Sequence, residues 1–532
     1  MENEKFKIKD GILTEYTGND EIIQIPNTVS VIGEGVFLEK IARKIIIPNS
    51  VKIIEKNAFR ECGISEIIMN DGVVTIGEYA FKHAYCNTIT FSKNLKEIQA
   101  HAFDFFLFCD LEIHKIELPE SIIKIGDSAF SSCEWLVTLP SSVKEIGKGA
   151  YSSTEMQEII IPSKINIIPE RAFEGCPNLE KVVIENAKMD VVSYYDDYTE
   201  GIEDIEKIKT VVSATKIKNM ALADCENIKE VIFPKTLTEI GSNAFSWCIS
   251  LKKVNIITQE VPLNIETDAF LDSGLEELYI CNTSYLNIQY GAFKNLPNLK
   301  KIKIIGTEYS NICIDSNAFE NCSRLEEINI VTKGRINIKS NAFSNCNELE
   351  EINIIAQEIN IGDYAFEGCT LLKKLNLQAE VLGISIGKYA FSNCKLLNAV
   401  NILPDVITYI YENSFEGCSS LKDINCGKLI CLKKDIPLFK CTHEEIMNII
   451  KNSEEIQISL KSREKANYHE SLNTYKNDEE EIQKNEKIEE VLEKLDEINK
   501  SIKESSKDKE YSGNSLNYNT IEDIIDGIWS IL

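Results

Sequence analysis

The sequence lacks the features that several large functional classes require. Its 532 residues contain no run of about 18 consecutive apolar residues, so we expect no membrane-spanning helix. The formal net charge is −27, and the basic track that nucleic acid binding needs is missing. The same charge disfavours insertion at an anionic membrane surface, and it favours a soluble protein or one with a basic protein partner.

Residues that carry catalysis or bind metals are also scarce. Only five histidines occur, and none pairs with cysteines or acids at the spacing of a metal site or a catalytic triad. No Cys-x-x-Cys pair is present, which leaves a zinc site without support. We therefore expect no enzymatic activity, no cofactor and no metal.

The N-terminal stretch "MENEKFKIKDGILTEYTG" has no apolar segment of the kind that a secretory signal carries. This absence predicts a cytoplasmic protein. The alternative is a cell-surface or secreted protein that is exported by a non-classical route.

What the sequence does contain is an internal repeat, centred on a recurring Ala-Phe pair. We call the aromatic residue of each pair, or its substitute, the marker. Most markers lie 21–27 residues apart, and one interval of 49 residues is close to two repeats. The sixteen markers are Phe37, Phe59, Phe81, Phe103, Phe130, Tyr151, Phe173, Leu222, Phe245, Phe270, Phe293, Phe319, Phe343, Phe366, Phe391 and Phe415.

One repeat predicts a strand followed by a compact turn or short helix. In residues 322–346, "CSRLEEINIVTKGRINIKSNAFSNC", the alternation of "LEEINI" is that of a strand with one buried face. A unit of this size cannot bury its own apolar face, so stacked units must share one core. Ten of the seventeen cysteines lie three residues after a marker, which predicts a column of buried thiols, with disulfides between consecutive units as the alternative.

The repeated "IGxxAFxxCxxLxxIxIP" pattern resembles the BspA-like leucine-rich repeat family, also called the Treponema pallidum-type repeat, over roughly residues 10–430. The resemblance implies an α/β repeat fold: a curved leucine-rich-repeat solenoid of about 17 units with a parallel β-sheet on its concave face. It also implies roles in adhesion and protein binding, and many members of the family are surface-exposed.

In each Ile-x-Ile triplet the middle residue should point away from the core. In the first half of the chain this position is partly apolar, which reflects either β-propensity or an apolar protein-binding patch. In the second half it is mostly asparagine, which predicts either a ladder of amides bonded from turn to turn or a polar track for a ligand. The residues that we select as candidate partner contacts are Ile46, Ile68, Ile160, Val183, Ile232, Tyr279, Asn329, Asn353 and Asn376.

Two further segments depart from the repeat. The irregular unit 185–220 contains "SYYDDYTEGIEDIE", in which Tyr194, Tyr195 and Tyr198 stand among acids; this is either a solvated insertion or an anchor for a basic partner. The terminal stretch "TIEDIIDGIWSIL" places Ile525 and Trp529 on one apolar helical stripe, which either folds back or docks on a partner. Pairs of charged residues before the strands, Lys252-Lys253 and Glu276-Glu277 for example, alternate in sign as blocks.

We therefore divide the chain into an N-terminal cap (1–20), a solenoid (21–441), a helical cap and amphipathic helix (442–504), a flexible linker (505–519) and a terminal amphipathic helix (520–532). The predicted function is that of a non-catalytic scaffold that binds a protein through its concave face, with the tail as a second contact. The alternatives are an adhesin for a host or matrix protein and a solenoid that targets a small C-terminal effector. The sequence does not predict the oligomeric state.

Overall fold

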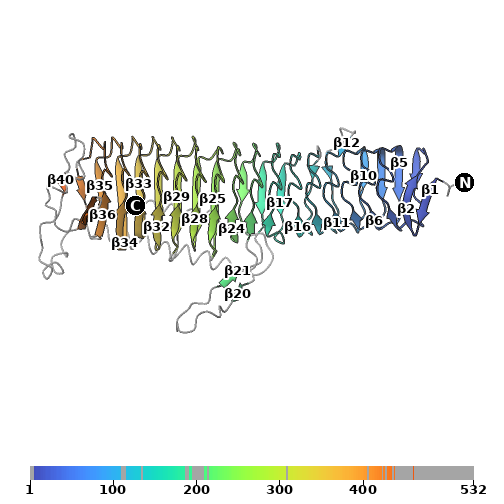
Figure 1. The fold of residues 1–532 in the computed structure, drawn as a ribbon, viewed down its shortest axis with the longest axis horizontal. Helices are drawn as coiled ribbons and strands as arrows, with labels where there is room; N and C mark the ends of the chain where they lie inside the picture. Colours follow the sequence, from blue (N-terminus) through green and yellow to red (C-terminus); the bar gives the residue numbers. More distant parts are fainter. Residues whose placement is uncertain are drawn as a thin grey trace. The chain divides into compact units, whose positions relative to one another are not determined.

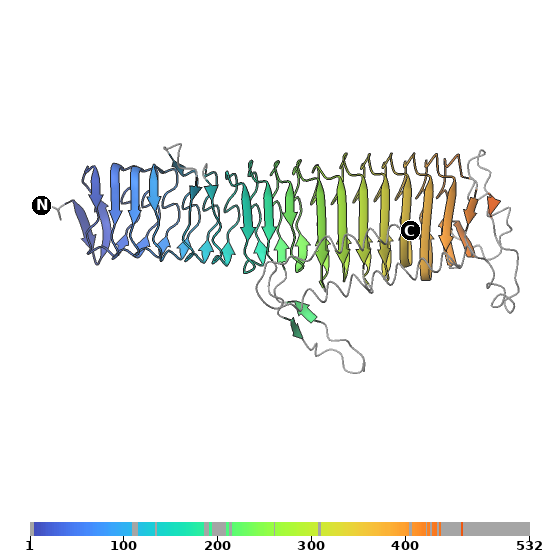
Figure 2. The same ribbon diagram turned by 180° about the vertical axis from the view of Figure 1, so that it is seen from behind.

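The fold is described from a computed structural model of the chain. The described residues are 5–108, 115–133, 136–185, 191–193, 209–211, 215–259, 261–306, 310–403, 407–421, 423–425, 428–433, 436–437 and 459–460. The chain divides into two compact units, Met1–Leu251 (unit 1) and Lys252–Leu532 (unit 2). Each unit is a stack of repeat turns whose strands form parallel sheets (Figures 1 and 2).

In unit 1 the strands on the side of the Ile-x-Ile triplets form three separate parallel sheets, which we call together the I-x-I sheet. It comprises β3 (Ile22–Gln24), β5 (Ile41–Ile47), β7 (Gly63–Met69), β9 (Tyr85–Cys86), β10 (Thr88–Thr90) and β12 (Leu107–Phe108), then β13 (Lys115–Ile116) with β15 (Leu136–Val137), then β17 (Glu158–Ile161), β19 (Lys181–Ile184) and β23 (Glu230–Ile232).

Of the strands that precede the Ala-Phe turns in unit 1, eight form one sheet and the last three belong to a separate sheet; we call them together the opposite sheet. It contains β1 (Phe6–Lys9), β2 (Ile12–Tyr16), β4 (Val31–Ile32), β6 (Ile53–Ile54), β8 (Thr75–Ile76), β11 (Glu97–Ile98), β14 (Lys124–Ile125) and β16 (Glu145–Ile146), followed by β18 (Ile167–Ile168), β22 (Thr215–Ile217) and β24 (Leu237–Ile240). Only the first pair, β1 with β2, is antiparallel within this sheet.

Unit 2 repeats the arrangement with longer strands. Its I-x-I sheet contains β25 (Lys253–Thr258), β27 (Glu277–Asn282), β29 (Lys301–Gly306), β31 (Glu327–Thr332), β33 (Glu351–Ile361), β34 (Lys374–Ile386), β35 (Ala399–Leu403) and β37 (Asp423–Asn425). Its opposite sheet contains β26 (Leu263–Ile265), β28 (Leu286–Ile288), β30 (Ile312–Ile314), β32 (Arg335–Ile338), β36 (Ile407–Tyr411) and β38 (Lys428–Lys433). The strands β33 and β34 run through both sheets, since β33 pairs with β31 in its first half and with β32 in its second.

The strands alternate buried and outward side chains, as a strand with one buried face must. In β17, for example, Ile159 and Ile161 are buried whereas Glu158 and Ile160 are exposed. The markers fill the interior between the sheets, and all sixteen are at most 1% exposed.

The marker rings form a stacked ladder in each unit. The centroids of Phe59 and Phe81 are 4.9 Å apart in unit 1, and those of Phe319 and Phe343 are 4.9 Å apart in unit 2, with nearly parallel rings. The backbone sets this spacing, because the N–H of most markers donates to a carbonyl of the next turn, as in Phe343 N to Ala365 O at 2.7 Å. Leu222 replaces the aromatic ring at one position of unit 1 and is equally buried.

The cysteines that follow the markers line the same interior. Thirteen cysteines of the described residues are free thiols; twelve are buried, and Cys313 is half-buried. Nine of the ten thiols of the column donate to the carbonyl of the marker in the preceding turn, as in Cys369 Sγ to Phe343 O at 3.4 Å. The predicted column of buried thiols is therefore confirmed for these residues. Burial raises the pKa of Cys62, Cys248 and Cys281 to about 12.

The buried thiols should be almost unreactive in the folded protein. At pH 8 we expect the thiols of Cys62 and Cys248 to react with an aromatic disulfide reagent at least about 100-fold more slowly than free cysteine. Burial keeps the reagent away from the sulfur, and the raised pKa lowers the fraction of thiolate. In denaturant all seventeen cysteines should react. Peptide mapping after native labelling identifies the modified residues, and rapid native modification of Cys62 or Cys248 would contradict the packing described here.

Two positions in each turn adopt the left-handed backbone conformation. They lie two residues before and two residues after the marker, as at Asn341 (φ 57°) and Asn345 (φ 60°) around Phe343. Asparagine and glycine tolerate this conformation best, which explains why the repeat reads "NAFSNC" or "AFEGC". Trp247 occupies the second position with φ 61° and is 53% exposed.

Replacing this tryptophan should stabilise unit 1. We expect Trp247→Asn to raise the free energy of unfolding by about 1 kcal/mol, since asparagine adopts a positive φ at lower cost. Urea unfolding followed by circular dichroism measures the change. Gly175→Ala, at the equivalent position with φ 65°, should act in the opposite direction. A loss of stability in Trp247→Asn would show that the indole makes contacts worth more than the strain.

An antiparallel hairpin covers the first turn of unit 1. Its strands β1 and β2 pair from Phe6↔Tyr16 to Lys9↔Ile12. The ring of Phe6 lies 4.9 Å from that of Tyr16, which in turn lies 5.5 Å from Phe37, so the hairpin ends the aromatic ladder. The outer strand carries Lys7 and Lys9, and charged side chains of this kind discourage pairing with a further strand.

The predicted leucine-rich-repeat solenoid with parallel sheets is confirmed. The Ala-Phe segments, for which either a turn or a short helix was expected, are turns throughout the described residues. Within the irregular unit 185–220, β20 (Val191–Ser193) and β21 (Lys209–Val211) form an antiparallel pair. The predicted helical tail, 442–532, lies outside the described residues except for the short strand β40 (Ser459–Leu460).

Candidate protein-binding surface

The outward residues of the I-x-I sheet of unit 1 line up in two columns. In the first, Gln24 lies opposite Ile46, Ile46 opposite Ile68, and Ile68 opposite Thr90. In the second, the predicted contacts Ile160, Val183 and Ile232 are direct neighbours on β17, β19 and β23. The register thus brings the predicted apolar residues of unit 1 together into two groups.

These columns are open to solvent to different degrees. Ile160 is 51% exposed, while Ile46, Ile68, Val183 and Ile232 are half-buried. Ion pairs border both columns: Lys44 Nζ lies 2.9 Å from Glu66 Oε1, and Lys181 Nζ lies 3.0 Å from Glu230 Oε2. Each group is therefore an apolar stripe flanked by paired charges, an arrangement typical of a protein contact with a polar rim.

The equivalent column of unit 2 is an amide ladder. Asn353 Nδ2 donates to Asn329 Oδ1 at 2.9 Å, Asn376 Nδ2 to Asn353 Oδ1 at 2.8 Å, and Asn401 Nδ2 to Asn376 Oδ1 at 2.9 Å. Of the two interpretations of these asparagines, the ladder that bonds from turn to turn is confirmed. Asn353 and Asn376 each use one amide N–H and the amide oxygen in hydrogen bonds to their neighbours, so fewer of their polar groups can bind a ligand.

Two residues of this column, Asn329 and Tyr279, are less accessible than a partner contact requires. Asn329 is only 1% exposed, because it lies between neighbouring strands and its amide also donates to the carboxylate of Glu327. The ring of Tyr279 lies between two ammonium groups, 4.8 Å from Lys253 Nζ and 5.3 Å from Lys303 Nζ. Both faces of this ring are therefore covered by cations of the protein itself.

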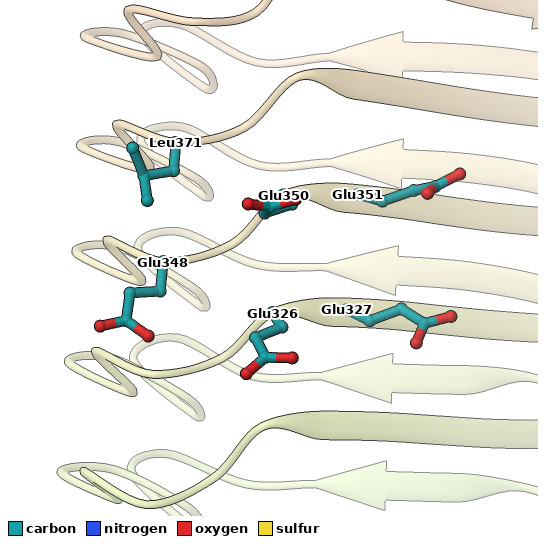
Figure 3. Close-up of a pocket in the computed structure, with 6 residues that line it drawn as sticks. All are labelled: Glu326, Glu327, Glu348, Glu350, Glu351 and Leu371. Atoms are coloured by element: carbon teal, nitrogen blue, oxygen red, sulfur yellow. The ribbon is translucent and has the colours of Figure 1, made fainter.

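Four carboxylates stand next to one another on the I-x-I sheet of unit 2. The register places Glu327 opposite Glu351. Glu326 and Glu350 are the residues immediately before them, so two pairs of like-charged residues lie next to each other (Figure 3). With Glu348 and Leu371 they line a cavity of about 490 Å³. Two lysines of the next turn pair with the second of these blocks. Lys373 Nζ lies 2.8 Å from Glu350 Oε1, and Lys374 Nζ lies 3.5 Å from Glu351 Oε2.

This acidic group was not recognised in the sequence. The charged blocks alternate in sign as predicted where Lys252, Glu276 and Lys300 meet, with ion pairs at 3.7 and 3.6 Å. The alternation fails between the blocks 326–327 and 350–351, which carry the same sign. The two acidic blocks are therefore visible in the sequence, one repeat apart. Only the strand register shows that they are neighbours in the structure.

The remaining predicted contacts lie outside the described residues: Tyr194, Tyr195 and Tyr198 of the irregular unit, and Ile525 and Trp529 of the tail. Among the residues that the structure describes, no three His, Cys, Asp or Glu side chains are placed to hold a metal ion.

The whole repeat region matches one family model. The model for the BspA type leucine-rich repeat region matches residues 8–106, 104–210, 198–312, 287–422 and 382–464. The chain belongs to the BspA-type leucine-rich repeat family. The resemblance inferred from the repeated motif is thereby confirmed, and the search of curated proteins found no match.

The chain is similar to solved structures of other leucine-rich repeat proteins, one of which reaches a TM-score of 0.50. A leucine-rich repeat protein of Bacteroides ovatus is 21% identical, with a TM-score of 0.50, over 86% of this chain and 97% of its own. A leucine-rich cell surface protein of Faecalibacterium prausnitzii is 19% identical over 85% of this chain and 96% of its own, with a TM-score of 0.30. The Treponema pallidum leucine-rich repeat protein is 20% identical over 47% of this chain and 88% of its own, with a TM-score of 0.25.

Proposed function

We propose that this BspA-type protein is a non-catalytic scaffold that binds a protein partner through the outward face of the I-x-I sheet of unit 1. The observation that carries the proposal is the alignment of Ile160, Val183 and Ile232, an apolar column with an exposed end and charged borders. β-Propensity accounts for branched residues on a strand, but it does not require them to stand side by side on an outward face.

The partner should be basic. The chain carries a net charge of −27, and adjacent carboxylates on unit 2 line a cavity, which together favour approach of a positively charged protein. The tail 520–532 is proposed as a second contact, so its deletion should weaken capture of the partner without changing the thermal unfolding of the two units.

A pair of matched double variants tests the proposal. Ile68→Glu with Ile160→Glu places charges on the I-x-I sheet, whereas Ile53→Glu with Ile167→Glu places the same charges at exposed isoleucines of the opposite sheet in the same unit. We expect affinity capture with quantitative mass spectrometry to show loss of the partner only for the first pair. Equal recovery by both pairs would refute the proposal.

The location of the protein belongs to the same proposal. None of the described residues forms a helix with the length and apolarity that a bilayer crossing requires. Columns of free thiols suit the reducing cytoplasm, which favours that compartment. The alternative, an adhesin at the cell surface, predicts that fractionation recovers the protein with the envelope and that surface proteolysis of intact cells removes it.

A further inference from the structure

Large apolar side chains gather at the N-terminal end of unit 1, at the corner where the turns enter the I-x-I sheet. Five of them are between 41% and 74% exposed, and we call them the apolar edge: Leu38, Ile41, Tyr85, Phe105 and Leu107. This edge is separate from the outward columns of the candidate surface, because its residues lie in the turns and at the first positions of the strands.

The register makes the apolar edge continuous. Ile41 lies opposite Gly63, Gly63 opposite Tyr85, and Tyr85 opposite Leu107. The glycine does not interrupt the row, because a Cβ atom at Gly63 would lie 2.2 Å from the Tyr85 ring. The tyrosine ring therefore covers the glycine and fills the space toward Ile41, which is 74% exposed.

Phe105 keeps its place at the edge in spite of backbone strain. Its φ is 53°, at the position where most turns carry a small or polar residue. Its ring stacks on that of His83, with the ring centroids 5.2 Å apart, and the residue is 47% exposed. An exposed aromatic residue in a strained conformation is a feature that the fold itself does not require.

Comparison with other turns of the same chain supports this interpretation. The position of Ile41, Tyr85 and Leu107, four residues after the marker, is Ser323, Asn347 and Thr370 in later turns. The repeat therefore does not require a large apolar residue at this position. A later turn carries Ile249 at this position, 47% exposed, but only the first turns align several such residues in one row.

The local charge indicates what covers this edge. Residues 5–108 contain nearly equal numbers of basic and acidic side chains, although the whole chain has a net charge of −27. Beside the edge the charges are already paired, with Lys82 Nζ 2.8 Å from Asp104 Oδ2 and Arg60 Nη2 3.0 Å from Glu61 Oε1. A second copy of the chain can therefore approach here without the repulsion that the acidic remainder would cause.

The size of the edge also suits a pair of copies. Five large side chains with these exposed fractions present on the order of 500 Å² of apolar surface, which matches the largest patch on a typical monomer, often a functional one, and fits the core of a contact that buries about 800 Å² per partner. We propose that the apolar edge is a self-association surface, through which two copies of the chain pair by a two-fold symmetric contact.

Light scattering coupled to size-exclusion chromatography, with sedimentation equilibrium of the full chain, tests the proposal. The wild type should have the mass of a dimer at micromolar concentration. Ile41→Asp and Phe105→Asn should each raise the dimer dissociation constant at least about tenfold, since each removes an exposed apolar anchor. Asparagine suits the positive φ of position 105, so Phe105→Asn should keep or raise the unfolding midpoint, which separates lost association from misfolding.

Trp247→Asn is the matched control: it makes the same kind of exchange at the same turn position, outside the apolar edge, and should leave the mass unchanged. A monomer at every concentration up to about 100 µM would overturn the proposal, as would a dimer that both edge variants leave intact. The proposal would also be overturned if the wild type is a monomer that captures a different protein and Ile41→Asp abolishes that capture, because the edge would then bind another partner.

Discussion

Phe343→Ala should lower the free energy of unfolding of unit 2 by about 3–5 kcal/mol. The ring of Phe343 is fully buried and stacks on Phe319 at 4.9 Å and on Phe366 at 5.0 Å. Its removal leaves a cavity in the centre of the ladder and breaks two ring stacks at once. The backbone bonds between turns hold the strands at a fixed spacing, so the neighbours cannot collapse into the space.

Phe343→Leu is the matched control for this prediction. Leucine occupies the equivalent position at residue 222 of unit 1, where it is fully buried. We therefore expect this variant to lose no more than about half as much as the alanine variant. Urea unfolding monitored by circular dichroism gives both values, and a loss below about 1 kcal/mol for Phe343→Ala would mean that the aromatic ladder is not a main source of stability.

Asn353→Asp should cost about 2 kcal/mol at pH 7, because it removes a donor from the middle of the amide ladder. Asn353 donates to Asn329 at 2.9 Å and accepts from Asn376 at 2.8 Å. A carboxylate keeps the second bond but faces the buried amide oxygen of Asn329 with a negative charge. The deficit should shrink as the pH falls toward about 4, since the Asn329 oxygen raises the pKa of the introduced carboxyl above its ordinary value and protonation gives it an O–H that can donate.

Asn264→Asp supplies the comparison in the same unit. Asn264 Oδ1 accepts from Asn287 Nδ2 at 2.8 Å and from Gln289 Nε2 at 3.0 Å, and a carboxylate oxygen accepts both bonds. This variant should therefore unfold at the wild-type denaturant concentration or above it. Equal losses in the two variants would show that the penalty comes from added negative charge and not from the lost donor.

The repeat made the interior of the protein predictable. The spacing of the Ala-Phe pairs gave the markers, and the position of Cys369 three residues after Phe366 predicted a buried column, because equivalent residues of stacked turns must meet. The alternation in the Ile-x-Ile triplets likewise predicted which side of each strand is buried. Both inferences rest on translation from one turn to the next, which a periodic sequence displays directly.

The outer surface was less predictable, since it depends on strand register and on side-chain contacts between turns. The burial of Asn329 and the enclosure of Tyr279 between two lysines follow from neighbours on adjacent strands. The adjacency of Glu327 and Glu351 also appears only once the register is known. The strain at Phe105 and Trp247 required the backbone conformation, which no spacing in the sequence reports.

We propose that the outward face of the I-x-I sheet in unit 1 binds a protein. The most direct test is a calorimetric titration of the captured partner into the wild type and into the two double glutamate variants. We expect Ile68→Glu with Ile160→Glu to weaken binding at least about tenfold, whereas Ile53→Glu with Ile167→Glu should leave the affinity unchanged. Unchanged affinity in the first variant, with both variants folded, would contradict the claim.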